Sequence, residues 1–415
     1  MLIAAYAVMA VAGCLNGWWW VLLGIVALAV GCYVLWLATV GRGGFTVRQV
    51  LAVAVILRVL MLPMPPGLSG DVYRYLWDGA VQLAGENPFA EKPELETRWH
   101  DSALYPEVSS EEYYSVYPPV SQFCFRLVAM LVDPMTHPLA ASYGMKLLCA
   151  LAELLALIVL VRQLASSSWA VLYAWNPLVI LECWGQVHSE SLALGLLAAA
   201  WLAWLKDRPA VTSMLVTLAG WVKVYPLLFL PLLVKRGSSM RTVASMIGVS
   251  MMVTILLWVP FWTADTWKHF RESIDLYVNR FEFNAGPYYA LKLFFGLIVG
   301  QVFRWCALVA TIVVWVICYR STDRDWRVGA AWIMVIHTLF ATTLHPWYFL
   351  MPMYLAIASG MRMMWAWWWL CIGSILTYVQ YPFPGSYWPL VSGIWLVALL
   401  LAISEWHLRR SQTAR

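Results

Sequence analysis

Apolar stretches recur along almost the whole sequence, and they constrain the fold more than any other feature. A helix needs about 20 residues to cross the hydrocarbon core of a bilayer, and stretches approaching that length follow one another from residue 2 to residue 406. Of the 415 residues, 62% are hydrophobic and 12% are charged, which excludes an ordinary soluble domain. We therefore predict an all-α polytopic membrane protein with about 11–13 membrane helices, folded as a single domain over residues 1–415.

The distribution of charge predicts the orientation of these helices. Residues 66–116 form a long loop, and its part from Pro66 to Glu112 holds ten carboxylates and three basic residues, a balance of 3 − 10 = −7. Basic residues gather in short connections such as 206–208 and 235–241, as the positive-inside rule expects of cytoplasmic loops. We therefore place the acidic loop on the extracytoplasmic side. The net charge of +5 reflects these basic connections, so we expect no nucleic-acid partner.

Within the acidic loop, Gly70–Pro88 predicts a short amphipathic helix. At 3.6 residues per turn, Asp71, Asp78 and Gln82 fall on nearly one line. Apolar residues collect on a different face: Val72, Leu76, Ala80 and Leu83. Gly85 and the closing proline are typical helix stops. We expect this helix to lie on the membrane surface, apolar face down, with its carboxylates facing away from the bilayer.

The number of crossings between Asp71 and His188 raises a question of topology. Three apolar stretches separate the two residues, and three crossings would place them on opposite sides of the membrane. If both residues serve one site, one stretch does not span. Trp169–Leu181, with 13 residues, is shorter than a crossing requires and is our candidate.

Two later regions also carry a prediction about their helices. Basic residues flank both ends of Val211–Val234, so we expect this stretch to form two short helices that turn near Lys223. Closer to the C-terminus, Tyr288–Val302 and Trp305–Tyr319 form separate apolar stretches.

Ionisable side chains within apolar sequence cost roughly 2.5–3.5 kcal/mol each on insertion scales and are often functional. His188 and Glu190 begin a helix after a polar run, and they either line a water-filled cavity beside a substrate or form a solvated helix end. Lys223, two residues before Tyr225, requires an anion such as a lipid-linked phosphate, or else a structural salt bridge.

Other polar positions are open to two interpretations. His345 and Trp347 predict a helix entry with an aromatic platform, for ligand contact or for interfacial anchoring. Arg280 lies in a loop, where it either binds a phosphate or sugar or is solvated. The isolated ionisable residues of the apolar stretches are interpreted as structural: Arg58, Arg126 and His337. The eight cysteines include no CxxC pair and the carboxylates form no evident cage, so we expect no structural zinc, disulfide framework, metal or other cofactor.

Several stretches together resemble the GT-C superfamily of membrane glycosyltransferases, most closely the bacterial polyprenyl-phosphate-mannose-dependent enzymes of glycosyltransferase family 87 and their relatives. Five segments carry this resemblance in the expected order: GDVYRYLWDGAVQLAGENPF (70–89), VYPPVSQ (116–122), YAWNPLVILECWGQVHSES (173–191), VKVYPLLFLP (222–231) and HPWYF (345–349). The resemblance covers most of the chain after the first 45 residues.

The resemblance implies an inverting transfer of a hexose, with mannose as the family expectation, from a polyprenyl-phosphate donor to an envelope lipid or glycan. The reaction is implied at the extracytoplasmic face of the bacterial inner membrane. The general base of such enzymes is an acidic residue of the first large loop, a role that falls on Asp71. The implied substrate-binding residues are Arg74, Tyr75, Asp78, Tyr117, His188, Glu190, Lys223, Tyr225, Arg280, His345 and Trp347.

The chemistry of such a transfer agrees with these residue types. One carboxylate suffices to take the proton of an attacking hydroxyl, and the departing phosphate needs only charge stabilisation, for which Lys223, Arg74 and Arg280 are candidates. A lipid-linked-sugar transporter or flippase without transferase chemistry is the alternative, since polar residues in many membrane helices fit it equally well. The absence of a visible internal repeat disfavours this alternative. A non-catalytic scaffold of envelope assembly is a third interpretation.

Overall fold

A computed structural model describes residues 2–14, 18–40, 44–164, 167–321, 325–361, 365–381, 383, 385 and 387–413. These residues form helices and connecting loops without a β-strand, and a single isolated bridge pairs Phe283 with Thr343. The all-α prediction is therefore confirmed.

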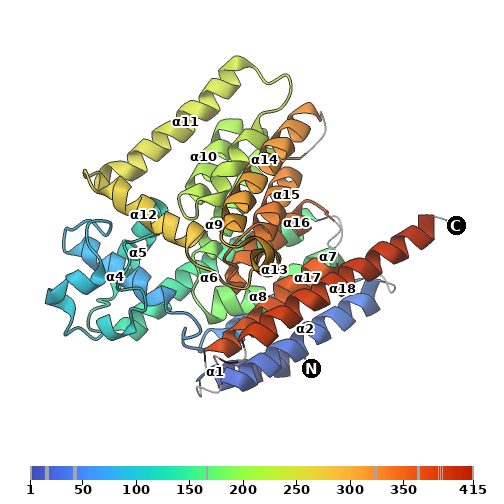
Figure 1. The fold of residues 1–415 in the computed structure, drawn as a ribbon, viewed down its shortest axis with the longest axis horizontal. Coiled ribbons are helices and arrows are strands. Elements are labelled where there is room, and N and C mark those ends of the chain that lie inside the picture. The colour runs from blue at the N-terminus through green and yellow to red at the C-terminus, as the bar shows by residue number, and fades with distance from the viewer. Residues whose placement is uncertain are drawn as a thin grey trace.

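The N-terminal helices pack as a hairpin. α1 (Leu2–Cys14) packs on α2 (Trp18–Val40), and α3 (Val47–Met61) packs on α1. From the opposite end of the chain, α17 (Trp365–Gly373) and α18 (Tyr387–Thr413) pack together. Figure 1 shows the two ends of the chain lying along the same side of the molecule.

A central layer of helices follows the acidic loop. α6 (Pro138–Gln163) packs against α9 (Glu190–Leu205), α9 against α10 (Pro209–Gly220), and α10 against α11 (Met240–Trp258). Beside this layer, α4 (Asp71–Leu83) packs on α5 (Pro119–Leu131). Three 3-10 turns connect α4 to α5: η1 (Pro93–Leu95), η2 (Thr97–Trp99) and η3 (Tyr105–Glu107).

The stretch that we expected not to span is broken into short pieces. α7 (Ser167–Ala174) is followed by α8 (Pro177–Ile180) and by a π-helical turn, η4 (Leu181–Gly185). The Asn176 side chain accepts a hydrogen bond from the Leu178 amide at 2.9 Å and starts α8. The segment 177–185 then meets α9 at a bend of 111°. This bend places the connection that contains His188 inside the molecule, and which of the stretches before it crosses the membrane stays a prediction.

A buried ion pair holds this broken segment in place. Arg58 of α3 forms two hydrogen bonds with Glu153 of α6, at 2.9 and 2.7 Å, and both side chains are fully buried. Trp184 donates to the same carboxylate at 2.8 Å, and Arg58 also donates to the carbonyl of Ala174 at 2.6 Å. The contacts of Arg58 are those of a structural residue.

The remaining helices enclose the other side of the central layer. η5 (Tyr225–Leu233) follows α10 after a turn and packs back on it, which confirms the predicted pair of short helices. η6 (Val259–Phe261) leads from α11 to the amphipathic α12 (Thr266–Asn279). α13 (Gly286–Phe295), α14 (Ile298–Arg320), α15 (Trp326–Leu339), η7 (Pro346–Phe349), α16 (Leu350–Ala358) and η8 (Ser374–Gln380) complete the fold.

The helix boundaries in residues 286–320 correct one prediction. The expected stretches Tyr288–Val302 and Trp305–Tyr319 are replaced by α13 and by one continuous helix, α14. The chain turns instead at Gly296, whose φ of +64° suits a residue without a Cβ. Arg304, which interrupts the apolar pattern, lies within α14.

Four helices of the described chain are long and apolar enough to cross a membrane, and the bent pair 177–185 and 190–205 makes a possible fifth. They are Pro138–Gln163, Met240–Phe261, Ile298–Arg320 and Tyr387–Leu408. The described chain also has shorter apolar helices, among them Leu2–Ala12, Val21–Trp36 and Pro119–Leu131. The chain is thus an integral membrane protein, and the larger number of crossings expected from the sequence stays a prediction.

Candidate active site

A cavity of about 930 Å³ lies where the acidic loop, the turn between α10 and η5, and the C-terminal half of the chain meet. α12, α14 and α15 also contribute to its wall. The cavity brings together half of the residues predicted for the site: Asp71, Tyr117, Lys223, Tyr225, His345 and Trp347. These residues come from segments far apart in the sequence, so tertiary packing creates the cavity.

Asp71 occupies the first position of α4 and faces the cavity. Gly70 before it permits a close approach of the loop, because a Cβ at that position would lie 2.2 Å from Ser109 Oγ. Burial raises the pKa of the Asp71 carboxyl above its usual 3.8, although the nearby His188 and Lys223 lower it. A carboxylate whose proton affinity is raised in this way suits a general base. Asp71 and His188 thus lie within electrostatic reach of each other, as a shared site requires.

The loop that precedes Asp71 is fastened to the segment that carries His188. Gln186 Oε1 accepts hydrogen bonds from the backbone amides of Gly67 and Leu68, each at 2.9 Å. Gln186 is 1% exposed, so these bonds are shielded from water. They set the position of α4 relative to the connection between η4 and α9.

His188 lies beneath the cavity floor and not on its wall. Its ring is fully buried and stacks on Trp347, with centroids 3.9 Å apart. Trp347 stacks in turn on His345, at 4.4 Å. On the other side, His188 Nδ1 lies 2.9 Å from Glu182 Oε2, and Tyr378 Oη donates to Glu182 at 3.1 Å. His188 therefore covers one face of Trp347 and His345 the other, while Phe283 stacks on His345 with centroids 4.5 Å apart. Trp347 and His345 line the cavity through their ring edges.

Lys223 lies in the turn between α10 and η5 and pairs with Glu190. Its Nζ is 2.9 Å from Glu190 Oε1, and it lies over the ring of Tyr348 at 5.5 Å. The turn depends on Gly220, because a Cβ there would come within 2.4 Å of the Leu227 side chain. The positive charge of Lys223 is thus balanced by a carboxylate of this chain.

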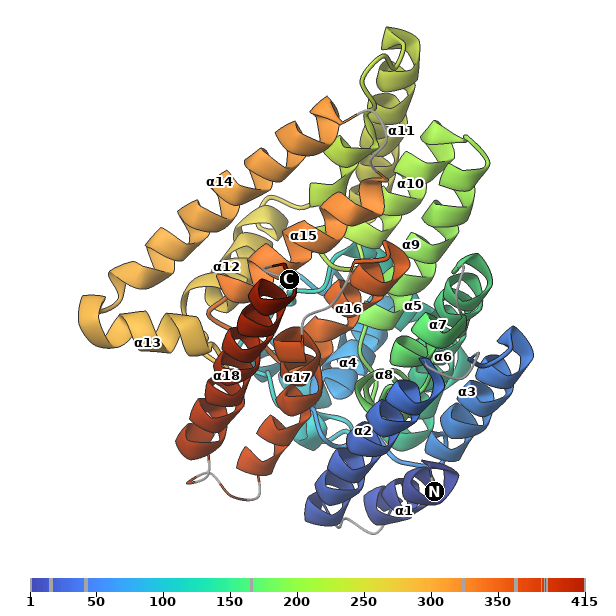
Figure 2. The same ribbon diagram turned by 90° about the vertical axis from the view of Figure 1, so that its right-hand side faces the viewer.

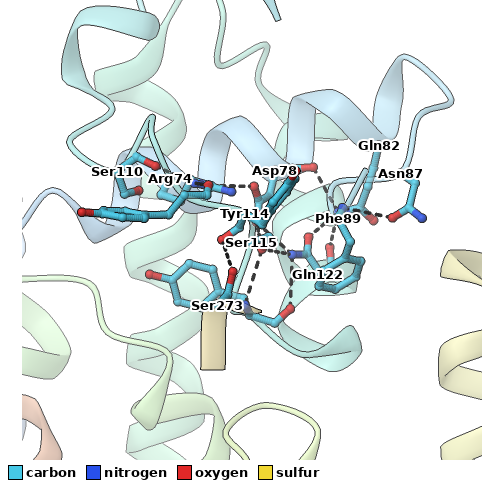
Figure 3. Close-up of polar contacts among 12 residues, drawn as sticks. Arg74, Asp78, Gln82, Asn87, Phe89, Ser110, Tyr114, Ser115, Gln122 and Ser273 are labelled. Carbon is cyan, nitrogen blue, oxygen red and sulfur yellow. Dashed lines mark hydrogen bonds and ion pairs between the residues drawn. The ribbon is translucent and has the colours of Figure 1, made fainter. Parts of the chain in front are cut away.

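The polar line of α4 contradicts one prediction from periodicity. We expected its carboxylates to face away from the bilayer into solvent, but Asp78 is 1% and Arg74 3% exposed. Asp78 accepts hydrogen bonds from Arg74 Nε at 2.9 Å, from Gln122 Nε2 at 2.8 Å, and from Ser115 Oγ. Figure 3 shows these side chains converging between α4 and the loop that leads to α5. The acidic loop and α5 cover this face of the helix, which an isolated helix would expose.

Besides His188 and Glu190, four residues predicted to bind substrate lie away from the cavity wall. Arg74 also donates to the backbone carbonyls of Ser110 and Tyr113, at 2.8 and 2.7 Å, so with Asp78 it belongs to a buried network. Tyr75 is fully buried and stacks on the Phe125 ring at 4.6 Å. The fourth residue, Arg280, has a side chain that is 70% exposed and lies 3.7 Å from Asp275.

Several wall residues were not predicted for the site from sequence: Tyr277, Arg304, Thr311, His337, Tyr378 and Tyr381. His337, which we interpreted as structural, contacts Thr311 Oγ1 through Nε2 at 3.2 Å. An arginine within an apolar helix is a signal for a functional residue. Arg304 was missed because it was interpreted as part of a break between two apolar stretches. Within the described ranges, no group of three or more His, Cys, Asp or Glu side chains is placed to hold a metal ion. The expectation of no metal stays a prediction.

Comparison with known proteins relates the chain to one group of enzymes. Residues 2–237 match a family model described as "Alpha-(1->6)-mannopyranosyltransferase, N-terminal domain". The chain is also 25% identical over 350 residues to Alpha-(1->6)-mannopyranosyltransferase A of Mycobacterium tuberculosis. That alignment covers 76% of this chain and 65% of the relative. The family match includes Asp71, His188, Glu190 and Lys223, and it ends before the segments that contribute Arg304 and His345.

Proposed function

The chain belongs to the alpha-(1->6)-mannopyranosyltransferase family, and on this premise we propose that it is a polyprenyl-phosphate-dependent mannosyltransferase. In this proposal, a mannosyl group passes from the lipid donor to a hydroxyl of an envelope lipid or glycan, with inversion, at the extracytoplasmic membrane surface. The observation that carries the proposal is the position of Asp71, a carboxylate with a raised pKa on the wall of a large cavity.

Asp71 acts as the general base. Its carboxylate takes the proton of the acceptor hydroxyl while the hydroxyl oxygen forms a bond with the anomeric carbon of the donor. The bond between that carbon and the phosphate oxygen breaks with its electron pair, and the lipid phosphate departs. The phosphate is already a stable anion, so no general acid is required. A single displacement of this kind uses one carboxylate, unlike the paired carboxylates of glycoside hydrolases.

The wall of the cavity suits the two parts of the substrate. Trp347 and His345 line the same cavity as Asp71. Their faces are covered by His188, by each other and by Phe283, so it is the ring edges that a sugar can contact. Apolar side chains line another part of the wall, including Leu228 of η5, Leu308 of α14 and Phe340 just after α15, and favour the lipid portion of a donor. An amphiphilic donor is therefore supported over a water-soluble one.

The proposed linkage follows from the relative and from the stereochemistry. The relative is named for an alpha-(1->6) linkage, and we propose the same linkage here. Because a single displacement inverts the anomeric centre, an α-linked product requires a β-linked donor. The sugar attached to the polyprenyl phosphate should therefore be a β-mannosyl group.

The test replaces Asp71 by asparagine, which keeps the shape of the side chain and removes its basicity. We expect Asp71→Asn to lower the transfer of radiolabelled mannose by about 10²–10⁴-fold, while the protein folds and binds donor as the wild type does. Asp101→Asn is the matched control, since Asp101 is an exposed residue of the same loop and the variant should retain full activity.

The same assay separates transfer from transport. Purified wild-type protein in detergent should form a new mannosylated product, which a transporter or flippase would not form. Wild-type transfer rates in Asp71→Asn would refute the role of the base, and the absence of any product from the wild type with every acceptor tested would refute the proposed activity.

A further inference from the structure

One side of α14 forms part of the cavity wall. Arg304, Ala307, Leu308 and Thr311 all line the cavity, and their spacing of three, one and three residues places them on one face of a helix. Figure 2 shows α14 at the edge of the helical assembly, with α13 at one end. The cavity therefore extends along a helix that is itself long enough to cross the membrane.

Arg304 is the charged end of this face. It lies six residues after Ile298, where α14 begins, which corresponds to about 9 Å along the helix axis. The far end of α14 is Arg320, next to a basic connection that the positive-inside rule assigns to the cytoplasm. Arg304 accordingly lies toward the extracytoplasmic end, and the apolar residues Ala307 and Leu308 lie deeper in the membrane.

The charge of Arg304 has no counterpart in the part of the chain that the structure describes. No ion pair or hydrogen bond joins its guanidinium to a described residue, whereas Lys223 is paired with Glu190 at 2.9 Å. Among the described residues of the cavity wall, Lys223 is the only lysine and Arg304 the only arginine. A guanidinium at membrane depth requires water or an anion, and of the two cations only Arg304 is available for a new partner.

The surroundings of Arg304 indicate the class of anion. Leu228 of η5 and Phe340, just after α15, also line the cavity, so an anion at Arg304 is close to apolar surface. A free inorganic anion gains nothing from that surface, but a phosphate that carries an isoprenoid chain does. The planar guanidinium also matches two phosphate oxygens at once.

We propose that Arg304 binds the phosphate of the lipid-linked donor and that the face of α14 below it holds the first isoprene units. This inference rests on the proposed function and assigns the phosphate to a residue other than Lys223. Lys223, already neutralised by Glu190, then serves the sugar end of the cavity beside Asp71. The resulting order along the cavity is base, sugar, phosphate and lipid.

The experiment measures binding, so it is independent of turnover. Farnesyl phosphate and farnesol are titrated into purified protein in detergent, and tryptophan fluorescence follows binding because Trp347 lines the cavity. The wild type should bind farnesyl phosphate more tightly than farnesol. Arg304→Gln should weaken binding of farnesyl phosphate by about tenfold or more, leave farnesol binding unchanged, and so remove most of the preference. Unchanged farnesol binding also shows that the variant is folded.

Three further variants make the result specific. Arg304→Lys should retain part of the preference, since the charge stays but the two-oxygen contact is lost. Arg320→Gln, an exposed arginine at the other end of the same helix, should bind both ligands as the wild type does. The double variant K223M/E190Q, which removes the lysine without leaving its carboxylate uncompensated, should leave the preference for farnesyl phosphate unchanged.

The outcomes separate this inference from the proposed function. If Arg304→Gln binds farnesyl phosphate as tightly as the wild type, or if the preference is lost in K223M/E190Q and kept in Arg304→Gln, the assignment to Arg304 is refuted and the transferase activity is untouched. If the wild type binds both ligands equally or binds neither, the polyprenyl-phosphate donor itself is refuted. If inorganic phosphate at a low concentration inhibits the binding of farnesyl phosphate, the inference is also overturned, since the site would then bind free anions.

Discussion

Removal of the Asp78 carboxylate should destabilise the protein. The side chain is 1% exposed and accepts hydrogen bonds from three side chains, of which Arg74 is 3% exposed. Asp78→Ala would leave a buried guanidinium that keeps only its two backbone carbonyl partners, at 2.8 and 2.7 Å. Breaking a buried ion pair from one side costs about 3–5 kcal/mol of the free energy of unfolding, and we expect a loss in that range.

The physical origin of this loss can be separated by further variants. Asp78→Asn keeps one acceptor for Arg74 but turns an amide donor toward the Gln122 amide group, so it should lose about half as much stability. Replacing both members of the pair, as in the double variant R74M/D78A, removes the uncompensated charge. The double variant should therefore lose less stability than the two single variants lose together, and the difference should be about 1–3 kcal/mol.

The assay is unfolding of the detergent-solubilised protein in denaturant, followed by tryptophan fluorescence. Asp101→Ala serves as the control, because the Asp101 side chain is exposed in the same loop and its loss should change the stability by less than about 0.5 kcal/mol. A wild-type unfolding midpoint for Asp78→Ala would refute the assignment of Asp78 to a structural network and would return it to the candidates for substrate contact.

Two other predictions concern the rate of transfer and helix packing. Because burial raises the pKa of Asp71 and a base acts only when deprotonated, kcat/KM should fall as the pH decreases through an apparent pKa above 3.8. If an Asp71→Asn variant rescued by an added small-molecule base shows the same fall at low pH, the fall does not report Asp71 and the prediction is wrong. Gly79→Ala should destabilise the protein by about 1–3 kcal/mol, because its Cβ would lie 2.5 Å from the Phe125 carbonyl oxygen of α5. Gly248→Ala, which meets no atom within 4 Å, should be close to neutral in the same unfolding assay.

Local pattern predicted a large part of the fold. The helix after Gly70 begins at Asp71 and ends at Leu83, as its periodicity and its following glycine indicate. Basic residues at both ends of 211–234 correctly predicted a turn near Lys223. Such features depend on neighbouring residues in the chain and on the requirement that backbone groups in a membrane pair within helices, so a sequence carries them directly.

The same reasoning failed where the surroundings of a side chain decide its state. Periodicity identified the polar face of α4, yet it did not reveal that the loop and α5 bury Asp78. Hydropathy divided α14 at Arg304, because it counts a charge as a break and takes no account of a cavity beside the helix. In both cases the missing information was which distant segments of the chain lie next to the side chain.

The sequence by itself determined that this chain is an all-α integral membrane protein and that Asp71 begins a helix in an acidic loop. It also singled out His188, Glu190 and Lys223 as polar residues in apolar surroundings. Only the tertiary structure decided which side chains meet: Glu190 neutralises Lys223, and Arg304 lines the same cavity without a charged partner among the described residues. The physical reason is that Coulomb interactions and desolvation depend on distances between helices, and residues far apart in the chain acquire those distances only when the helices pack.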